Sequence, residues 1–121
     1  MAKGSISHIE FPADDLERSK RFYGAVAGWQ FGPMEGLPEY ELFQTGETTG
    51  GAIGKRGASV GKVVRVYIDV DDLEGAVAAA EANGGTVVTA PSPVPGFGRY
   101  AAVLDPEGNE IGLFEGAPSG G

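Results

Sequence analysis

Residues 6–29, ISHIEFPADDLERSKRFYGAVAGW, run from a strand pattern directly into a helix pattern. Successive side chains of a strand point to opposite sides, so His8 and Glu10 share one face and Ile9 and Phe11 share the other. The Asp pair that follows can cap a helix, and the glycine before the tryptophan can end it. The stretch therefore predicts a strand–helix unit that buries its aliphatic and aromatic side.

The same plan returns in the second half of the chain, where VRVYIDVDDLEGAVAAAEANGG ends in two glycines. The tetrapeptide DDLE at 14–17 lies 57 positions before DDLE at 71–74, and Gly28 lies 57 positions before Gly85. A repeat of that length within 121 residues indicates two copies of one supersecondary unit.

Each copy reads as a strand, a helix and three further strands, which predicts an α+β fold made of two βαβββ modules. The modules are expected at residues 1–56 and 57–121 within one compact domain, with a flexible Gly-rich tail at 116–121. Hydrophobic alternation and turn residues delimit the expected strands. These cover residues 5–11, 29–31, 39–44, 51–55, 63–70, 86–89, 99–104 and 110–114.

The spacing of residue types along the chain predicts several local structural features. The first helix should bury a stripe at three-to-four spacing, and Glu17 should pair with Arg21. The second helix should bury a stripe of its own. Residues 56–61 read as a linker between the modules, and residues 91–98, PSPVPGFG, as a loop over a cavity mouth. The expected stripes are Leu16, Ser19, Phe22 or Tyr23, and Val26 in the first helix, and Leu73, Val77 and Ala80 in the second.

Composition narrows the function classes. A net charge of −8 argues against nucleic acid, whose phosphates require clustered Lys and Arg, and it suits solubility or attraction of cationic ligands. The chain has no cysteine, so disulfides and thiol chemistry are excluded. We find no signal-peptide pattern and no long apolar run, and we expect a cytoplasmic protein without membrane contact.

Period-two alternation gathers six polar and aromatic residues on strand faces opposite the aliphatic ones, which makes this face the expected pocket. His8 can act as a general acid or base oriented by Glu10 or Glu110, or it can be a structural histidine. Arg65 can clamp an anionic group or form an internal salt bridge. The six residues are His8, Glu10, Arg65, Tyr67, Glu110 and Phe114.

Three aromatic residues can stack on a planar ligand, or they can be ordinary core residues. They are Tyr67, Phe97 and Phe114. A further pair, Tyr40 and Tyr100, is separated by 60 positions, and the pattern leaves open which face each of them occupies.

Two βαβββ units with a strand–DDLE–helix opening, and the closing segment DPEGNEIGLFE at 105–115, resemble the vicinal oxygen chelate superfamily. That group includes glyoxalase I, bleomycin-resistance proteins and extradiol dioxygenases. The chain looks most like small bacterial glyoxalase-like proteins, and the resemblance covers residues 6–115. It implies a curled, cup-shaped mixed sheet with the helices outside, and a homodimer.

The resemblance also implies where a metal would be held. The four ligand positions of metal-dependent members fall here on His8, Gly54, Arg65 and Gly112. Arginine stays cationic and glycine has no side chain, so the metal site is expected to be degenerate. Two further carboxylates leave one alternative, a displaced facial site for a divalent metal made of His8, Glu10 and Glu110.

Three functions remain open at this stage. The first is a protein that binds a small organic molecule in the cup and needs no cofactor. The second is a metal-dependent enzyme, a glyoxalase I-like lyase or isomerase or a dioxygenase, that uses His8 with Glu10 and Glu110. The third is a protein without a ligand, whose ion-paired face serves an interaction.

Overall fold

A computed structural model describes residues 3–46 and 49–117 of the chain. The chain divides into two compact units, Ser7–Arg65 and a second one made of Met1–Ile6 and Val66–Gly121. We call them the first unit and the second unit. The expected module boundary at residues 56 and 57 stays a prediction, and residues 118–121 of the expected tail lie outside the described part of the chain.

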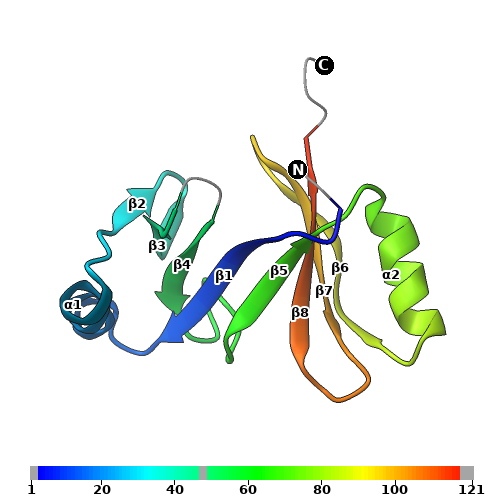
Figure 1. The fold of residues 1–121 in the computed structure, drawn as a ribbon, viewed down its shortest axis with the longest axis horizontal. Coiled ribbons are helices and arrows are strands. Elements are labelled where there is room, and N and C mark those ends of the chain that lie inside the picture. The colour runs from blue at the N-terminus through cyan, green and yellow to red at the C-terminus, as the bar shows by residue number, and fades with distance from the viewer. Residues whose placement is uncertain (1–2, 47–48, 118–121) are drawn as a thin grey trace. The chain divides into compact units, whose positions relative to one another are not determined.

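The strands of the first unit pair in the order β2-β3-β4-β1, with β1 parallel to β4 and the other pairs antiparallel (Figure 1). Its helix follows the first strand. The elements are β1 Ile6–Ala13, α1 Leu16–Ala27, β2 Gly32–Met34, β3 Leu37–Gln44 and β4 Gly50–Lys55.

The second unit repeats this connectivity, with strand order β5-β8-β7-β6 and β5 parallel to β8. The expected α+β class and its two βαβββ modules are therefore confirmed. The elements are β5 Arg65–Asp69, α2 Leu73–Ala82, β6 Thr86–Val94, β7 Gly98–Leu104 and β8 Glu110–Gly116.

The second Asp of the repeated DDLE segment is the N-cap residue of each helix. Asp15 accepts a hydrogen bond from Arg18 N–H at 3.1 Å, and Asp72 accepts one from Gly75 N–H at the same distance. Each carboxylate satisfies a backbone donor that the first helical turn leaves unpaired. Gly28 ends α1 at φ 73°, a left-handed conformation that costs glycine little.

An aromatic cluster forms the core between α1 and its sheet. Trp29 stacks on Phe43 at 4.2 Å between ring centroids and on Tyr23 at 5.3 Å, and Phe11 lies 5.3 Å from Tyr23. The strand expected at residues 29–31 is wrong. These residues form a connection whose rings pack into the cluster, and the strand begins at Gly32.

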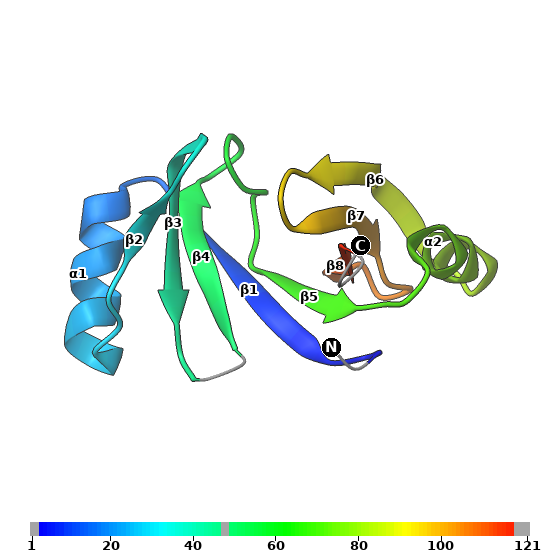
Figure 2. The same cartoon turned by 90° about the horizontal axis from the view of Figure 1, so that it is seen from above.

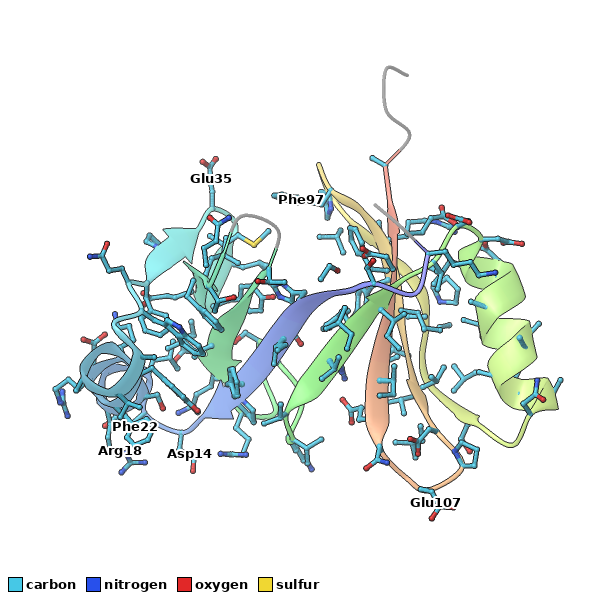
Figure 3. The ribbon with its side chains drawn as sticks, viewed as in Figure 1. Asp14, Arg18, Phe22, Glu35, Phe97 and Glu107 are labelled. Atoms are coloured by element: carbon cyan, nitrogen blue, oxygen red, sulfur yellow. The ribbon has the colours of Figure 1, made fainter. Side chains whose placement is uncertain are left out.

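The expected buried stripe of α1 is only partly correct. Its C-terminal half turns Tyr23 toward the sheet, while Phe22 and Val26 are 58% and 69% exposed. Figure 3 shows Phe22 on the outer side of the helix. The expected Glu17–Arg21 pair is replaced by a bond between Glu17 and Lys20 at 2.7 Å, because Lys20 also reaches Glu41 on β3.

An aliphatic core forms between α2 and β6–β8, where the helix lies along one face of these strands (Figure 2). Leu73 has no exposed surface and packs with Ala101, Val103 and Leu113. Val77 and Ala80 complete the same face, so the expected stripe of α2 is confirmed.

The loop expected at residues 91–98 is wrong over its first half, because β6 continues to Val94. Among the described residues this strand lies at the end of the sheet order and pairs only with β7, so its prolines interrupt no second ladder there. The register shifts between Val87 and Thr89 and between Thr89 and Ser92. The turn then covers residues 95–97.

Neither α1 nor α2 has the length and the apolar content that a bilayer-spanning helix needs, within the residues described here.

Candidate functional site

A polar network occupies the face of the first unit that points away from α1. The hydroxyl of Tyr40 lies 3.0 Å from Nε2 of His8 and donates a hydrogen bond to Oε2 of Glu10 at 2.8 Å. The strand registers explain the meeting, because Tyr40 on β3 and the two β1 residues flank the intervening strand β4. Glu10 and Tyr40 are both buried.

Arg65 completes this network at the C-terminal end of the first unit. Its Nη1 lies 3.9 Å from Oε1 of Glu10, and both residues are less than 10% exposed. A buried guanidinium needs an anionic partner, since an isolated buried charge is strongly destabilising. The internal ion pair expected between Arg65 and a carboxylate is therefore present, and Glu10 supplies it.

His8 lies in a largely desolvated position, and burial lowers its pKa below the usual 6.5. The negative charge of Glu10 acts in the opposite direction and raises the pKa, but burial is the larger effect. His8 is thus predominantly neutral at pH 7. A neutral imidazole has one donor nitrogen and one acceptor nitrogen.

The segment at residues 56–61 covers Gly54, one of the implied ligand positions. A Cβ placed on Gly54 would lie 2.5 Å from Cγ1 of Val60 and 2.8 Å from Oγ of Ser59. Val60 packs with Tyr40 and Ala52, and Ser59 accepts from Lys55 N–H. These residues, expected as a linker between the modules, fold back onto the sheet.

The ring of Tyr67 covers the other glycine at an implied ligand position, Gly112. The two residues are register partners in the parallel pair β5–β8, and a Cβ on Gly112 would overlap the Tyr67 ring. Tyr100 lies 6.3 Å from Tyr67 between ring centroids and stands opposite Phe114 on β8. An aromatic surface thus lies on the face of the second unit that points away from α2.

The two remaining site candidates belong to the second unit as well. Glu110 begins β8, opposite Leu104. Phe97 lies in the β6–β7 turn and is 54% exposed, and Figure 3 shows it at the tip of that hairpin. The roles predicted for the candidate residues, including the metal alternative His8, Glu10 and Glu110, stay predictions.

The residues at the four implied ligand positions do not fit a divalent metal. Arg65 brings a positive charge, and both glycines are covered by neighbouring side chains. His8 alone offers a donor atom there, whereas a catalytic divalent site usually takes three protein ligands.

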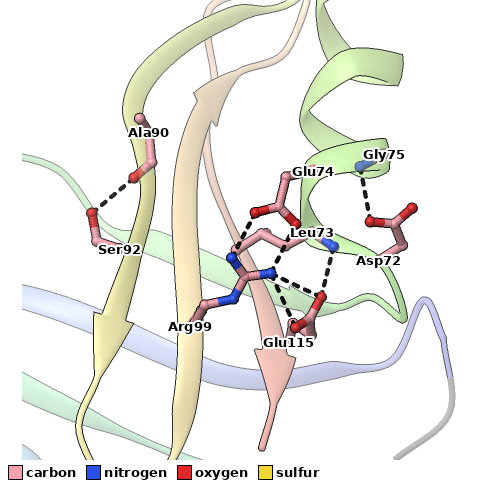
Figure 4. Close-up of polar contacts among 8 residues, drawn as sticks. All are labelled: Asp72, Leu73, Glu74, Gly75, Ala90, Ser92, Arg99 and Glu115. Atoms are coloured by element: carbon pink, nitrogen blue, oxygen red, sulfur yellow. Dashed lines mark hydrogen bonds and ion pairs between the residues drawn. The ribbon is translucent and has the colours of Figure 1, made fainter.

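In the described part of the chain, one group of carboxylates lies close enough together to hold a metal ion. It consists of Asp72, Glu74 and Glu115. Arg99 already binds two of them, with contacts of 2.6 Å to Glu74 and 3.1 Å to Glu115 (Figure 4). Glu115 also accepts from the Leu73 N–H at the start of α2. The group therefore joins α2 to β7 and β8.

Tyr40 is the central residue of the polar network, and the sequence reading left its side of the sheet open. One signal could have placed it. Phe43 continues the aromatic pattern that packs under α1, and residues three apart on a strand face opposite sides. Tyr40 therefore faces away from α1, together with His8 and Glu10.

Sequence comparisons agree with this architecture. The family model described as Glyoxalase/Bleomycin resistance protein/Dioxygenase superfamily matches residues 5–113. The chain belongs to this superfamily. A "Glyoxylase-like domain-containing protein" from Didymella fabae is 36% identical, with 88% of this chain and 89% of that protein covered. A "Probable lactoylglutathione lyase" from Vibrio parahaemolyticus is 31% identical, with 95% and 93% covered.

The "Putative glyoxylase CFP32" of Mycobacterium bovis is 30% identical over 95% of this chain but only 45% of its own length, so the chain spans about half of that relative. Among solved structures, a hypothetical protein from Bacillus halodurans has a TM-score of 0.73 at 13% identity, covering 99% of both chains. A methylmalonyl-CoA epimerase has a TM-score of 0.66 at 15% identity, covering 98% and 99%. These two structures share the fold.

Proposed function

We propose that this chain binds a small organic molecule on the polar face formed by His8, Glu10, Tyr40 and Arg65, without a divalent metal. The observation that carries the proposal is the covering of both glycines at the implied ligand positions, Gly54 by Val60 and Ser59 and Gly112 by Tyr67. Replacing either glycine by a residue that can bind a metal would require neighbouring atoms to move.

The contacts around Glu10 support the same proposal. One carboxylate oxygen accepts from Tyr40, and the other faces Arg65. A cation placed beside Glu10 would compete with the guanidinium and be repelled by it. Tyr67, Phe97 and Phe114, all in the second unit, stay predicted ligand contacts, and Arg65 favours a ligand with a carboxylate or phosphate group. The net charge of −8 favours a cationic ligand instead.

Metal analysis of the purified protein tests the proposal, together with thermal shifts on adding Fe²⁺, Mn²⁺, Ni²⁺, Co²⁺ or Zn²⁺. The variants are Glu10→Ala and Glu110→Ala, and Glu107→Ala in an exposed turn is the matched control. We expect metal far below one equivalent and the same thermal response in all four proteins. Near-stoichiometric metal that both site variants lose, and the control keeps, would contradict the proposal.

A ligand screen tests directly whether the protein binds a small molecule. Carboxylate-bearing and ammonium-bearing aromatic compounds of matched size should be compared by their effect on the melting temperature. We expect one class to stabilise the wild type and to do so less in His8→Ala. Arg65→Lys retains the positive charge and should weaken only the carboxylate class. No stabilisation by either class would favour an interaction role.

The second candidate is a metal-dependent enzyme that uses His8, Glu10 and Glu110. It is favoured by the relative named as a lactoylglutathione lyase at 31% identity. The metal analysis separates this candidate from the first.

We further propose a homodimer in the cytoplasm. The superfamily resemblance supports the dimer, and the lack of cysteine supports a reducing compartment. Sedimentation at several protein concentrations tests the dimer, and a molar mass of one chain at all of them would contradict it.

A further inference from the structure

The hydroxyl of Tyr40 stands between two ionisable side chains of the same face. It lies 3.0 Å from Nε2 of His8 and 2.8 Å from Oε2 of Glu10. Both distances are within hydrogen-bonding range for these atom pairs. Tyr40 thus links the histidine to the carboxylate, and the two hydrogen bonds must share one phenolic hydrogen.

The carboxylate determines which of the two hydrogen bonds uses the phenolic hydrogen. The Glu10 carboxylate, which forms an ion pair with the Arg65 guanidinium at 3.9 Å, offers only acceptor oxygens. Tyr40 therefore donates to Glu10, as the geometry indicates. Its oxygen can then interact with His8 only as an acceptor, so Nε2 of His8 must carry a hydrogen.

We infer that Tyr40 is a positioning residue of this face, which holds neutral His8 as the Nε2–H tautomer, so that Nδ1 is the acceptor. Any group that hydrogen-bonds to Nδ1, whether from the protein or from a ligand, must then donate.

The surroundings of Tyr40 hold its ring in place. Tyr40 stands opposite Gly54 in the β3–β4 pair, and its Cδ2 would be 3.3 Å from a Cβ on that glycine. Ala52 and Val60 pack against the ring in a buried cluster. The hydroxyl is therefore directed by packing and by two hydrogen bonds.

Nitrogen-15 NMR of the imidazole tests the tautomer directly, because His8 is the sole histidine of the chain. In a neutral imidazole the protonated and unprotonated nitrogens have well-separated shifts. We expect the wild type above the pKa of His8 to show Nε2 protonated and Nδ1 unprotonated. Tyr40→Phe should shift both signals toward a mixture of tautomers. Tyr23→Phe, on the α1 side of the same unit, is the matched control and should match the wild type.

A second variant keeps the inference testable if Tyr40→Phe does not fold. Glu10→Met combined with Arg65→Met removes the buried pair together, which avoids leaving one charge alone. Without the carboxylate, Tyr40 can donate to His8, so the Nδ1–H fraction should rise. A wild type with Nδ1–H, or an unchanged Nε2–H pattern in both variants, would overturn the inference.

Discussion

The ring of Tyr67 lies directly over Gly112, its partner in the parallel pairing of β5 with β8. Tyr67 is buried, and the space that a side chain on Gly112 would need is already filled by ring carbons. The two positions are therefore coupled. A residue larger than glycine at position 112 requires the ring to move.

We predict that Gly112→Ala destabilises the protein by about 1–3 kcal/mol, the usual cost of an overpacked site. Gly116→Ala is the control in the same strand, because a Cβ there meets its nearest neighbour at 3.8 Å. It should change the free energy of unfolding by about 0.5 kcal/mol or less. Urea denaturation of both variants provides the measurement.

The coupling itself can be measured with Tyr67→Ala. This substitution removes the ring, so adding Gly112→Ala to it should cost much less than in the wild type. Additive effects of the two substitutions would mean that the ring does not cause the cost.

The stability of the protein should depend on the ionisation of His8. Its pKa in the folded state is lowered from 6.5, so protonation of His8 disfavours folding. The stability that neutral His8 provides is complete above about pH 6.5 and decreases as the pH falls toward the lowered pKa. As the pH falls, the free energy of unfolding of the wild type should decrease relative to that of His8→Gln. Urea denaturation of both proteins between about pH 7.5 and about pH 5 provides the measurement. A difference that is constant with pH would contradict this.

The charge of Glu10 should be measurable at His8. Burial lowers the pKa of His8, and the Glu10 carboxylate partly offsets this by raising it. We therefore expect Glu10→Gln to lower the pKa of His8 further. NMR titration of the single imidazole gives the value, with Glu17→Gln on the exposed side of α1 as the control. A higher pKa in Glu10→Gln would show that the charge of Glu10 does not act on His8.

Leu73 should be among the most sensitive core positions of the second unit. It has no exposed surface and packs with Ala101, Val103 and Leu113. Leu73→Ala should lower the free energy of unfolding by about 2–5 kcal/mol, because it removes buried methyl groups and leaves a cavity. Val88→Ala, at a position that is 49% exposed, should have a much smaller effect in the same urea experiment.

Arg99 should control the ionisation of Glu74. Its guanidinium binds both carboxylate oxygens and lowers the pKa of Glu74 from 4.5 to about 2. Arg99→Met should return this pKa toward 4.5, and added salt should weaken the effect in the wild type. Carbon-13 NMR titration of the Glu74 carboxyl group is the measurement, with Arg21→Met on α1 as the control.

The direction of the stability effect follows from this lowered pKa. The stabilisation from ionised Glu74 is present above about pH 4.5 and is lost as the pH falls toward about 2. Arg99→Met should therefore lose stability at neutral pH and lose less at acidic pH. Equal losses at both would indicate a packing role for Arg99.

The repeated module was predictable because its signals are local. Each DDLE segment carries a capping carboxylate, and Leu73, Val77 and Ala80 recur at helical spacing. The errors arose where local signals do not distinguish two outcomes. The aromatic run at residues 29–31 packs as rings in a connection, and the prolines after residue 90 lie in an edge strand that tolerates them.

The site was predictable to the extent that alternation along one strand determines it. His8 and Glu10 share a face by parity, and Arg65 meets Glu10 as the need for a buried counterion suggests. Tyr40 depends on a single signal, the aromatic Phe43 three residues later, because residues 37–44 alternate without a consistently apolar side. The covering of Gly54 by Val60 depends on how a glycine-containing segment folds back, which periodicity does not describe.

The covered glycines also bear on how this chain can evolve. Gly54 is blocked by residues that follow it in the chain, and Gly112 by a ring from a preceding strand, so the two obstructions are unrelated. A mutation that introduced a metal-binding side chain at either position would be harmful until a second mutation cleared the space. Selection acting one step at a time would remove such intermediates. A side chain at either position would therefore need a compensating change in the residues that cover the glycine.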